Sequence, residues 1–332
     1  SHFFTDEGFR WIQWEVGRQT LEPLVELKAL RDLVNIYKQE KPDLVHHHTI
    51  KPVLYGSLAA RVAGVPGVVN SITGRGYVFS SDKNKARLLR SLIKGLYRIG
   101  FKQPKLQVIF ENSEDRGYFI QEKIIPSEHC HLIRSVGVDP LRFQPSPEPP
   151  GLPVALFTGR MLWDKGVGVL VEAARILKSH QVVKVVIAGN PDPGNPESIS
   201  IETLRLWELE GLIAYAGWRP DIENLYAESA LVVVPTMYGE GVPTVLLEAA
   251  ASGRPVVASD TPGCREFVED GVNGLLVPPG DAMALALAIE RLATNPPLRA
   301  EMGAQGRELV LANFTKQTVN EETLSVYLKA MA

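Results

Sequence analysis

The chain runs twice through an alternation of short apolar segments and longer amphipathic segments, and a proline-rich stretch at 145–151 separates the two rounds. Such alternation predicts a mainly parallel β-sheet with helices packed on its faces. The prolines favour a stiff linker over a helix or a strand. Because 332 residues suffice for two domains of ordinary size, the sequence predicts two α/β domains joined by this linker.

The expected elements follow from apolar runs bounded by Gly, Pro and polar residues. Before the linker, strands are expected at 43–47, 68–72, 107–111 and 131–133, and helices at 24–39, 53–63, 85–99 and 114–121. After it, strands are expected at 154–158, 182–188, 212–215, 231–234, 255–259 and 274–277, and helices at 167–179, 200–210, 242–251, 282–294, 298–311 and 316–331. Residues 8–14 alternate like a strand that enters a helix, so the start of the chain reads like the middle of a domain.

Composition excludes several classes of protein. A net charge of −3 argues against a dedicated nucleic-acid-binding protein. Cys130 and Cys264 have no C-x-x-C spacing, so neither a disulfide scaffold nor a zinc site is indicated, and a reducing cytoplasm fits. No apolar run approaches the roughly 20 residues of a membrane-spanning helix, and the first residues lack the design of a signal peptide.

Residues 240–253 place two carboxylates eight residues apart, Glu240 in a Gly/Pro turn and Glu248 in an otherwise apolar helix. Pro243 suits the first helical turn, whose free N–H groups attract anions. Helical side chains lean toward the N-terminus, so both carboxylates can approach one ligand there. Two common glutamates alone could be a loop residue and a helix former, but the apolar flanks leave Glu248 needing a partner. A nucleotide sugar would suit this arrangement.

The same stretch also resembles the sequence signature of a known protein family. The pattern Glu-Gly-x-Pro-x-x-x-Leu-Glu-Ala-x-Ala-x-Gly-x-Pro-Val-Val at 240–257 resembles the signature of the family-four retaining glycosyltransferases. That family has the GT-B fold, an α/β architecture of two Rossmann-like domains facing across a cleft. The resemblance implies an acceptor-side domain at 1–148, a nucleotide-sugar donor domain at 149–314, and a helix at 315–332 that packs back on the first domain. Because the family normally opens with a strand, a glycine-rich turn, a helix and a second strand, we expect the first domain to be incomplete at its start.

Arg160 and Lys165 lie on a strand-to-helix turn between two glycines, Gly159 and Gly166. Two cations beside a helix N-terminus can hold a diphosphate without a metal ion. Alone they could be stray charges on a solvated loop, but the family places an Arg and a Lys on the donor's diphosphate at these positions. No D-x-D carboxylate pair occurs, so no metal cofactor is expected.

The rest of the donor site is expected in loops that follow strands, where open α/β sheets bind ligands. Trp218 offers a flat face to a uracil base, although inter-element packing explains it equally well. By resemblance, Glu248 binds the ribose hydroxyls and Glu240 lies by the transferred sugar, with the amides of Gly241 and Val242 nearby. The implied donor-binding residues are Gly159, Gly189, Asn190, Trp218, Arg219, Gly241, Val242, Pro243, Thr244 and Glu248, and the implied catalytic residues are Glu240, Arg160 and Lys165.

On the acceptor side, three consecutive histidines at 46–48 end a strand. Adjacent strand residues point to opposite faces, so the three cannot ligate one metal ion. We expect His46 or His48 to face the cleft and bind the acceptor or the transferred sugar. The loop with Thr73, Gly74 and Arg75 resembles that of bacterial enzymes adding N-acetylhexosamine-type sugars to undecaprenyl-diphosphate-linked acceptors, although many family members have a His where Thr73 stands.

Basic residues recur through 83–105 between apolar ones, and no acidic residue interrupts them. A basic amphipathic segment suits docking on anionic lipid headgroups, which would place the protein peripherally on the inner face of the cytoplasmic membrane. An ordinary surface helix with its apolar stripe in the core is the equal alternative.

These observations together predict retaining transfer of a sugar from a UDP-sugar to a glycan hydroxyl in surface-polysaccharide assembly. Front-face transfer is favoured over Glu240 as a covalent nucleophile. Two alternatives stay open, a nucleotide-sugar epimerase of the same fold and a non-catalytic nucleotide-sugar-binding subunit.

Overall fold

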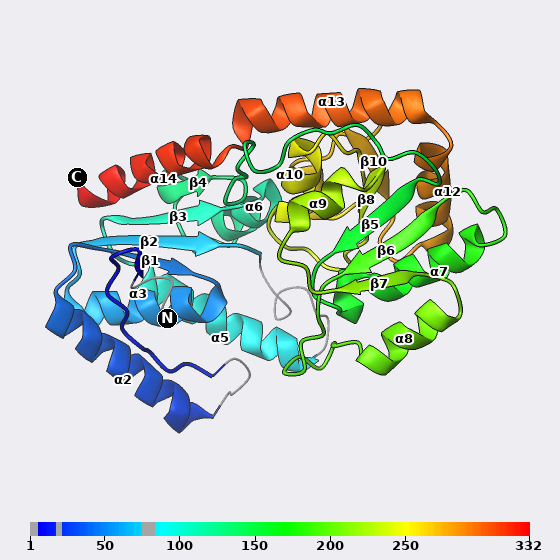
Figure 1. The fold of residues 1–332 in the computed structure, drawn as a ribbon. Helices are drawn as coiled ribbons and strands as arrows, with labels where there is room; N and C mark the ends of the chain where they lie inside the picture. The colour runs from blue at the N-terminus through cyan, green and yellow to red at the C-terminus, as the bar shows by residue number, and fades with distance from the viewer. Residues whose placement is uncertain (1–5, 18–21, 75–83) are drawn as a thin grey trace.

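The computed structural model describes residues 6–17, 22–74 and 84–332. It contains two separate sheets, one of four strands in the order β1-β2-β3-β4 and one of six in the order β10-β9-β8-β5-β6-β7. All strand pairs in both sheets are parallel. The two sheets form two domains side by side (Figure 1), which confirms the expected α/β class with two parallel-sheet domains.

The first sheet and the helices before the linker are built from α2 (Pro23–Glu40), β1 (Leu44–His48), α3 (Ile50–Ala63), β2 (Gly67–Ile72), α5 (Asn84–Gly100), β3 (Leu106–Phe110), α6 (Ser113–Gln121), η1 (Ser127–His129) and β4 (Cys130–Leu132). Residues 6–17 contain no strand, so the strand expected at 8–14 is wrong. Helix α3 starts three residues earlier than expected because Pro52 is tolerated in a first helical turn.

The remaining elements are β5 (Val154–Thr158), η2 (Trp163–Lys165), α7 (Val167–Leu177), β6 (Lys184–Ala188), α8 (Ile201–Leu209), β7 (Ala214–Gly217), α9 (Ile222–Ala227), β8 (Leu231–Val234), α10 (Thr244–Ala251), β9 (Val256–Ser259), α11 (Pro262–Arg265), β10 (Gly274–Val277), α12 (Ala282–Ala293), α13 (Pro296–Asn313) and α14 (Lys316–Met331). The short helix α9 was not expected, because six residues are too few to show a helical period. Among the described residues, no helix is both long and apolar enough to cross a bilayer.

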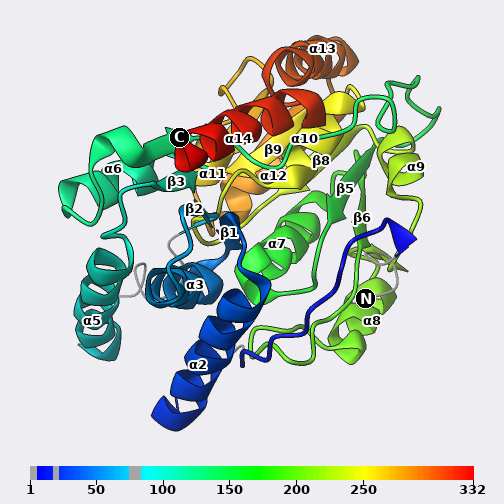
Figure 2. The same cartoon turned by 90° about the vertical axis from the view of Figure 1, so that its left-hand side faces the viewer.

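Helices cover both faces of each sheet. In the first domain, α3 and α5 lie on one face, and α14 lies on the other after the chain has passed through the second domain (Figure 2). Val319, Val326 and Ala330 of α14 are buried against Val69 and Ile109 of the sheet. In the second domain, α7 and α12 cover one face, and α9, α10 and α13 cover the other. The last helix thus belongs to the core of the first domain.

The chain passes between the domains twice, and the two passages lie against each other. The Val138 N–H donates to the Phe314 carbonyl, and the Lys316 N–H donates to the Val138 carbonyl, both at 2.9 Å. Gly137, with φ of 72°, lets the two backbones approach this closely, because an added Cβ would lie 2.8 Å from the Thr315 carbonyl oxygen. The passages therefore form one paired junction.

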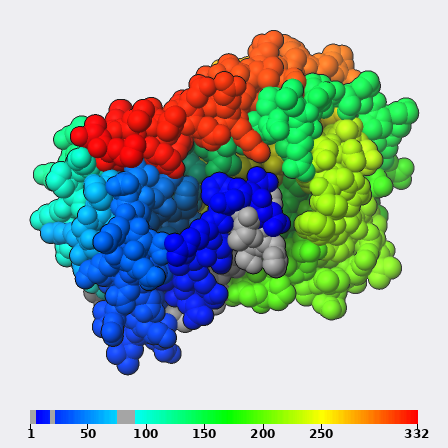
Figure 3. Space-filling view, turned by 60° about the vertical axis from the view of Figure 1, so that its left-hand side comes forward, coloured from blue at the N-terminus to red at the C-terminus, as the bar shows by residue number. Residues whose placement is uncertain are grey.

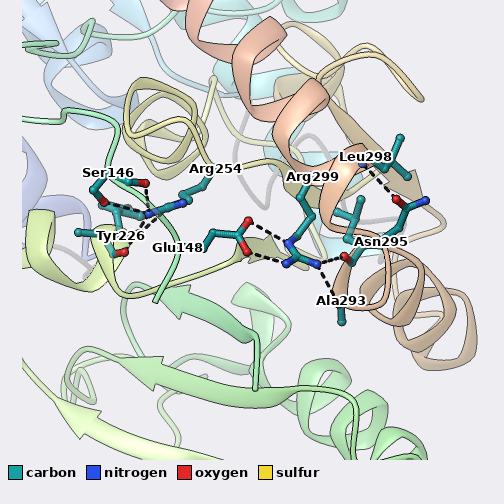
Figure 4. A network of polar contacts seen from close by, with 10 residues as sticks. Ser146, Glu148, Tyr226, Arg254, Ala293, Asn295, Leu298 and Arg299 are labelled. Carbon is teal, nitrogen blue, oxygen red and sulfur yellow. Dashed lines mark hydrogen bonds and ion pairs between the residues drawn. The ribbon is translucent and has the colours of Figure 1, made fainter. Parts of the chain in front are cut away.

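Two buried arginines of the second domain fasten the linker (Figure 4). Arg254 donates to the carbonyl and hydroxyl oxygens of Ser146, both at 2.9 Å. Arg299, only 4% exposed, forms a two-pronged ion pair with Glu148 at 3.0 and 2.6 Å and also donates to the carbonyls of Leu292 and Ala293. The proline-rich linker is thereby held rigidly on the second domain.

We expect Arg299→Met to lower the free energy of unfolding by about 3 kcal/mol, because Glu148 and two buried carbonyls lose their donor. Urea unfolding followed by circular dichroism would measure the loss. The exposed Arg291 of α12 provides the matched control, and Arg291→Met should stay within about 0.5 kcal/mol. Equal effects of the two substitutions would contradict a role for Arg299 in holding the linker.

Candidate active site

The carboxyl ends of β5, β6 and β7 and the start of α10 surround a cavity of about 510 Å³, called here the nucleotide cavity. Its lining residues are Thr158, Gly159, Arg160, Ala188, Gly189, Asn190, Pro191, Asp192, Pro193, Trp218, Arg219, Ile222, Val245 and Glu248. Seven of the residues expected to bind the donor or act on it therefore share one site. The structure adds Asp192, whose carboxylate accepts from Arg160 Nη1 at 3.0 Å.

Trp218 lies on the rim of the nucleotide cavity and is 65% exposed. Such exposure is unusual for a packing residue of this size and leaves its face open to a planar ligand. Beside it, Arg219 is held by Asp221, with Nε 2.7 Å from Oδ1. A flat aromatic surface and an oriented guanidinium thus occupy one wall of the cavity.

Glu248 projects from the second turn of α10 into the nucleotide cavity. Its Oε2 accepts a hydrogen bond of 2.8 Å from the hydroxyl of Tyr226. Burial raises the pKa of Glu248, and the bond from Tyr226 opposes that rise. The apolar residues around Glu248 predicted that its carboxylate has a polar partner, and that partner is Tyr226. The sequence did not show which residue it would be.

A second cavity of about 500 Å³ lies between the domains, called here the interdomain cavity. Its lining residues are Thr49, Ile50, Lys51, Pro52, Thr73 and Gly74 of the first domain, Tyr238, Gly239 and Glu240 of the second, and Val16 and Gly17 of the N-terminal segment. Figure 3 shows the dark-blue N-terminal residues between the two domains. Arg75, expected on this side, lies outside the described residues.

Glu240 lines the interdomain cavity, and Lys165, which lines neither cavity, is its ion-pair partner. Lys165 Nζ contacts both carboxylate oxygens of Glu240, at 2.8 and 2.6 Å, and lies over the ring of Tyr238. Burial alone lowers the pKa of Lys165, but Glu240 and Tyr238 raise it on balance, so the ammonium stays charged. Two of the three residues expected to be catalytic thus form one ion pair, and the third, Arg160, pairs with Asp192.

The turn before α10 differs from expectation in two respects. Pro243 is the N-cap of α10 with an extended ψ of 124°, and the helix begins at Thr244, so Pro243 is not in the first turn. The Gly241 amide, expected near the sugar and phosphate, donates to the Thr73 carbonyl at 2.8 Å. The two domains touch at this point, and this contact occupies the amide. Val242 is buried below the turn, and Thr244 is exposed.

The structure places the histidines outside both cavities. His46 contacts Tyr327 of α14 through Nδ1 at 2.6 Å and Ser71 through Nε2 at 2.7 Å, so both ring nitrogens are occupied. Burial, with His48 and His47 nearby, lowers the pKa of His46 to about 3, and the neutral ring links α14 to the sheet. The ring of His48 lies beside it in a tilted arrangement, with the two ring centroids 4.0 Å apart. Among the described residues, no three His, Cys, Asp or Glu side chains are arranged to hold a metal ion.

Two residues of the first domain were missed. Thr49, at the edge of the interdomain cavity, has φ of 72° and ψ of 164°, a backbone conformation that non-glycine residues rarely adopt and that is found at functional sites. Glu111, just after β3, lies against Gly241, where an added Cβ would overlap its carboxylate. Burial raises the pKa of Glu111 to about 7, and the charges of Glu240 and Asp115 add to that rise.

Comparison with known proteins identifies the family. Residues 139–309 match the family Glycosyl transferases group 1, and residues 4–112 match Glycosyl transferase 4-like. The chain is a group 1 glycosyltransferase. It is 30% identical, over 97% of its length and 86% of the relative's, to an N,N'-diacetylbacillosaminyl-diphospho-undecaprenol alpha-1,3-N-acetylgalactosaminyltransferase of Campylobacter jejuni. A UDP-Gal:alpha-D-GlcNAc-diphosphoundecaprenol alpha-1,3-galactosyltransferase of Escherichia coli is 28% identical over 82% of this chain and 72% of its own.

Solved structures agree on the fold of this glycosyltransferase. A glycosyltransferase from Rickettsia africae superposes with a TM-score of 0.78 over 99% of this chain and 87% of its own, at 22% identity. HepE of Anabaena in complex with UDP superposes with a TM-score of 0.73 over 91% of this chain and 83% of its own, at 23% identity. The GT-B fold expected from the sequence is confirmed.

We expect Glu111→Gln to stabilise the glycosyltransferase more at pH 8 than at pH 5. The folded-state pKa of about 7 lies above the ordinary value of 4.5, so the folded protein binds the extra proton between these values and loses stability as pH rises through them. The glutamine side chain does not ionise, so the variant avoids that loss. Its gain in free energy of unfolding should be larger at pH 8 than at pH 5 by on the order of 2 kcal/mol. Urea unfolding at both pH values would measure it.

Packing changes at Glu111 affect both pH values equally, so the difference between them isolates the ionisation. Glu301→Gln, at an exposed site in α13, should show no such difference. A pH-independent effect of Glu111→Gln would mean that Glu111 is already ionised in the folded protein near pH 5.

Proposed function

We propose that this glycosyltransferase moves an N-acetylhexosamine, with retention, from a UDP-sugar to a hydroxyl of an undecaprenyl-diphosphate-linked glycan. The observation that carries the proposal is the pair of cavities: Arg160 and Glu248 line the nucleotide cavity, and Glu240, paired with Lys165, lines the interdomain cavity. A nucleotide at one cavity and an acceptor at the other would meet at Lys165. The names of the Campylobacter and Escherichia relatives support the lipid-linked acceptor, and the former supports the sugar.

The donor would lie along the carboxyl edge of the second sheet. Trp218 would face the uracil and Glu248 would accept from the ribose hydroxyls. The diphosphate would contact Arg160 and Lys165. Each of these cations already has a carboxylate partner, Asp192 at 3.0 Å and Glu240 at 2.6 Å. These carboxylates orient the two cations before the donor binds. On binding, the diphosphate oxygens would displace the carboxylates.

In the transfer, the bond between the sugar C1 and the phosphate oxygen breaks, and a bond from C1 to the acceptor oxygen forms on the same face. The acceptor proton passes to the leaving phosphate oxygen. Arg160 and Lys165 stabilise the negative charge that develops on the diphosphate, without a metal ion. Glu240 lines the interdomain cavity, where the sugar would lie, and we favour a role in placing the sugar over a covalent attack on C1.

A lipid-linked acceptor implies work at a membrane surface, on the cytoplasmic side if the donor is cytoplasmic. Tyr97 of helix α5 is buried in the hydrophobic core of the first domain, as expected for an ordinary surface helix. Its Leu92 and Ile99, however, are 60% and 50% exposed, and the exposed Lys102 follows the helix. Exposed apolar groups beside cations suit peripheral docking on anionic headgroups.

Binding of nucleotides tests the donor site. We expect UDP and UDP-N-acetylhexosamines to raise the melting temperature, since a ligand at 100 times its dissociation constant adds roughly 2.7 kcal/mol. GDP and ADP should have weaker effects. Lys165→Ala should abolish most of the shift and most of the turnover, because the diphosphate loses a charged partner. Glu248→Ala should lose most of the turnover too. Differential scanning fluorimetry and sugar-transfer assays measure both.

The same assays separate the alternatives. An epimerase would consume UDP-sugar without an acceptor, and a binding subunit would show the thermal shift without turnover on any lipid-linked glycan. Membership of the glycosyltransferases favours transfer over both. No shift with any uridine nucleotide, or near-normal turnover in Lys165→Ala, would refute the proposed donor site.

Membrane docking needs its own test. Vesicles with 30% anionic phospholipid should sediment the protein at low salt and release it as salt rises. The double variant Leu92→Asp/Ile99→Asp should stay in the supernatant. Leu209→Asp, at an 86% exposed leucine of α8 in the second domain, should sediment like the parent. If the parent does not sediment with anionic vesicles at low salt, the proposed docking is refuted.

A further inference from the structure

We propose that Tyr226 is a positioning residue that sets the ribose selectivity of the nucleotide cavity, by holding Glu248 in the orientation that accepts from a ribose hydroxyl. Tyr226 lies on α9, does not line the cavity and is fully buried. The inference rests on the proposed function, because it takes Glu248 as the residue that meets the ribose.

The hydroxyl of Tyr226 belongs to a hydrogen-bond chain with a fixed direction. It lies 2.8 Å from Glu248 Oε2 and 3.1 Å from Thr158 Oγ1. An ionised carboxylate only accepts, and a phenol has one proton, so Tyr226 donates to Glu248 and Thr158 donates to Tyr226. Burial raises the pKa of Tyr226 well above its ordinary value, so the phenol remains a donor at neutral pH.

Glu248 needs such a donor because its surroundings disfavour its charge. Its neighbours Leu247 and Ala249 are fully buried, and burial raises the pKa of its carboxyl group. The bond from Tyr226 stabilises the ionised form and fixes the plane of the carboxylate. Without that bond, the side chain would gain rotational freedom or take up a proton. Either change weakens an acceptor that faces the cavity.

The backbone of Tyr226 is itself held in place (Figure 4). Arg254 Nε donates to the Tyr226 carbonyl at 3.0 Å, and its Nη2 donates to the Ala227 carbonyl at 2.8 Å and to Ser146. The last turn of α9 is therefore fixed to the linker by a buried guanidinium. Because the backbone of Tyr226 is fixed, its hydrogen bond to Glu248 also fixes the carboxylate. A residue outside the cavity can therefore control binding inside it.

Selectivity is the property that this arrangement should control. A buried carboxylate aimed at a hydroxyl rejects an analogue without it, because the carboxylate oxygen that would face that hydroxyl then lacks a donor. The rejection depends on orientation, since an acceptor that swings freely finds water instead. Loss of Tyr226 should thus reduce the preference for ribose more than it reduces binding of a deoxyribose analogue.

The experiment compares UDP, 2′-deoxy-UDP and 3′-deoxy-UDP by isothermal titration calorimetry on the parent protein and on Tyr226→Phe. The parent should bind UDP at least tenfold more tightly than one deoxy analogue. In Tyr226→Phe, UDP affinity should fall about tenfold while that analogue changes less than threefold, so the preference shrinks toward one. With a UDP-sugar donor, KM should rise and kcat should change little.

Tyr97→Phe is the matched control, because Tyr97 is an equally buried tyrosine in the first domain, and it should retain the full preference. If Tyr226→Phe does not fold, Thr158→Val keeps the phenol but removes its donor, and the preference should fall by a smaller factor. The proposal would be overturned if Tyr226→Phe kept the full preference for UDP over the deoxy analogue, or if Thr158→Val kept it where that variant is needed. It would also be overturned if the parent bound all three nucleotides equally. A parent that binds no UDP would instead refute the proposed function.

Discussion

The paired junction between the domains is the constraint on which the rest of the molecule depends. Two backbone hydrogen bonds of 2.9 Å hold Val138 against residues 314–316, so the chain's two passages act as one connection. Arg254 and Arg299 extend that rigidity along the linker. Across the domains, Glu266 accepts from the Ser113 amide and from Arg134, both at 2.6 Å. These contacts bring the first domain's loops to the carboxyl edge of the second sheet, and the interdomain cavity exists only because of that placement.

Within the site, three charged side chains have a polar partner before any ligand binds. Arg160 has Asp192, Lys165 has Glu240, and Glu248 has the Tyr226 hydroxyl. For Lys165 and Glu248, which are partly buried, the partner offsets a charge that would otherwise be costly, whereas Arg160 is exposed. An incoming diphosphate then exchanges one anionic partner for another, so the cations keep their orientation. A site built in this way combines stability without ligand with fixed donors for the transition state.

Much of this could be predicted from the sequence, because the information was local. Within the described residues, each of the ten strands begins and ends within two residues of its expected position, and the residues after β5, β6 and β7 share one cavity. The failures at His46 and at the Gly241 amide depend on tertiary contacts. His46 is occupied by Tyr327, almost the whole chain away, and the Gly241 amide is taken by Thr73 of the other domain. Tyr226 and Glu111 gave no signal, because one buried tyrosine or glutamate looks like any other.

Helix α14 is the last element to be synthesised, but it packs on the first domain. Val319, Val326 and Ala330 close one face of the first sheet, yet the ribosome adds them after the whole second domain. Until α14 docks, Val69 and Ile109 face solvent, so the second domain, which is contiguous in sequence, can reach its native state earlier than the first. The nascent first domain therefore waits with an uncovered apolar surface, and this interval is when aggregation or chaperone binding would act on the chain.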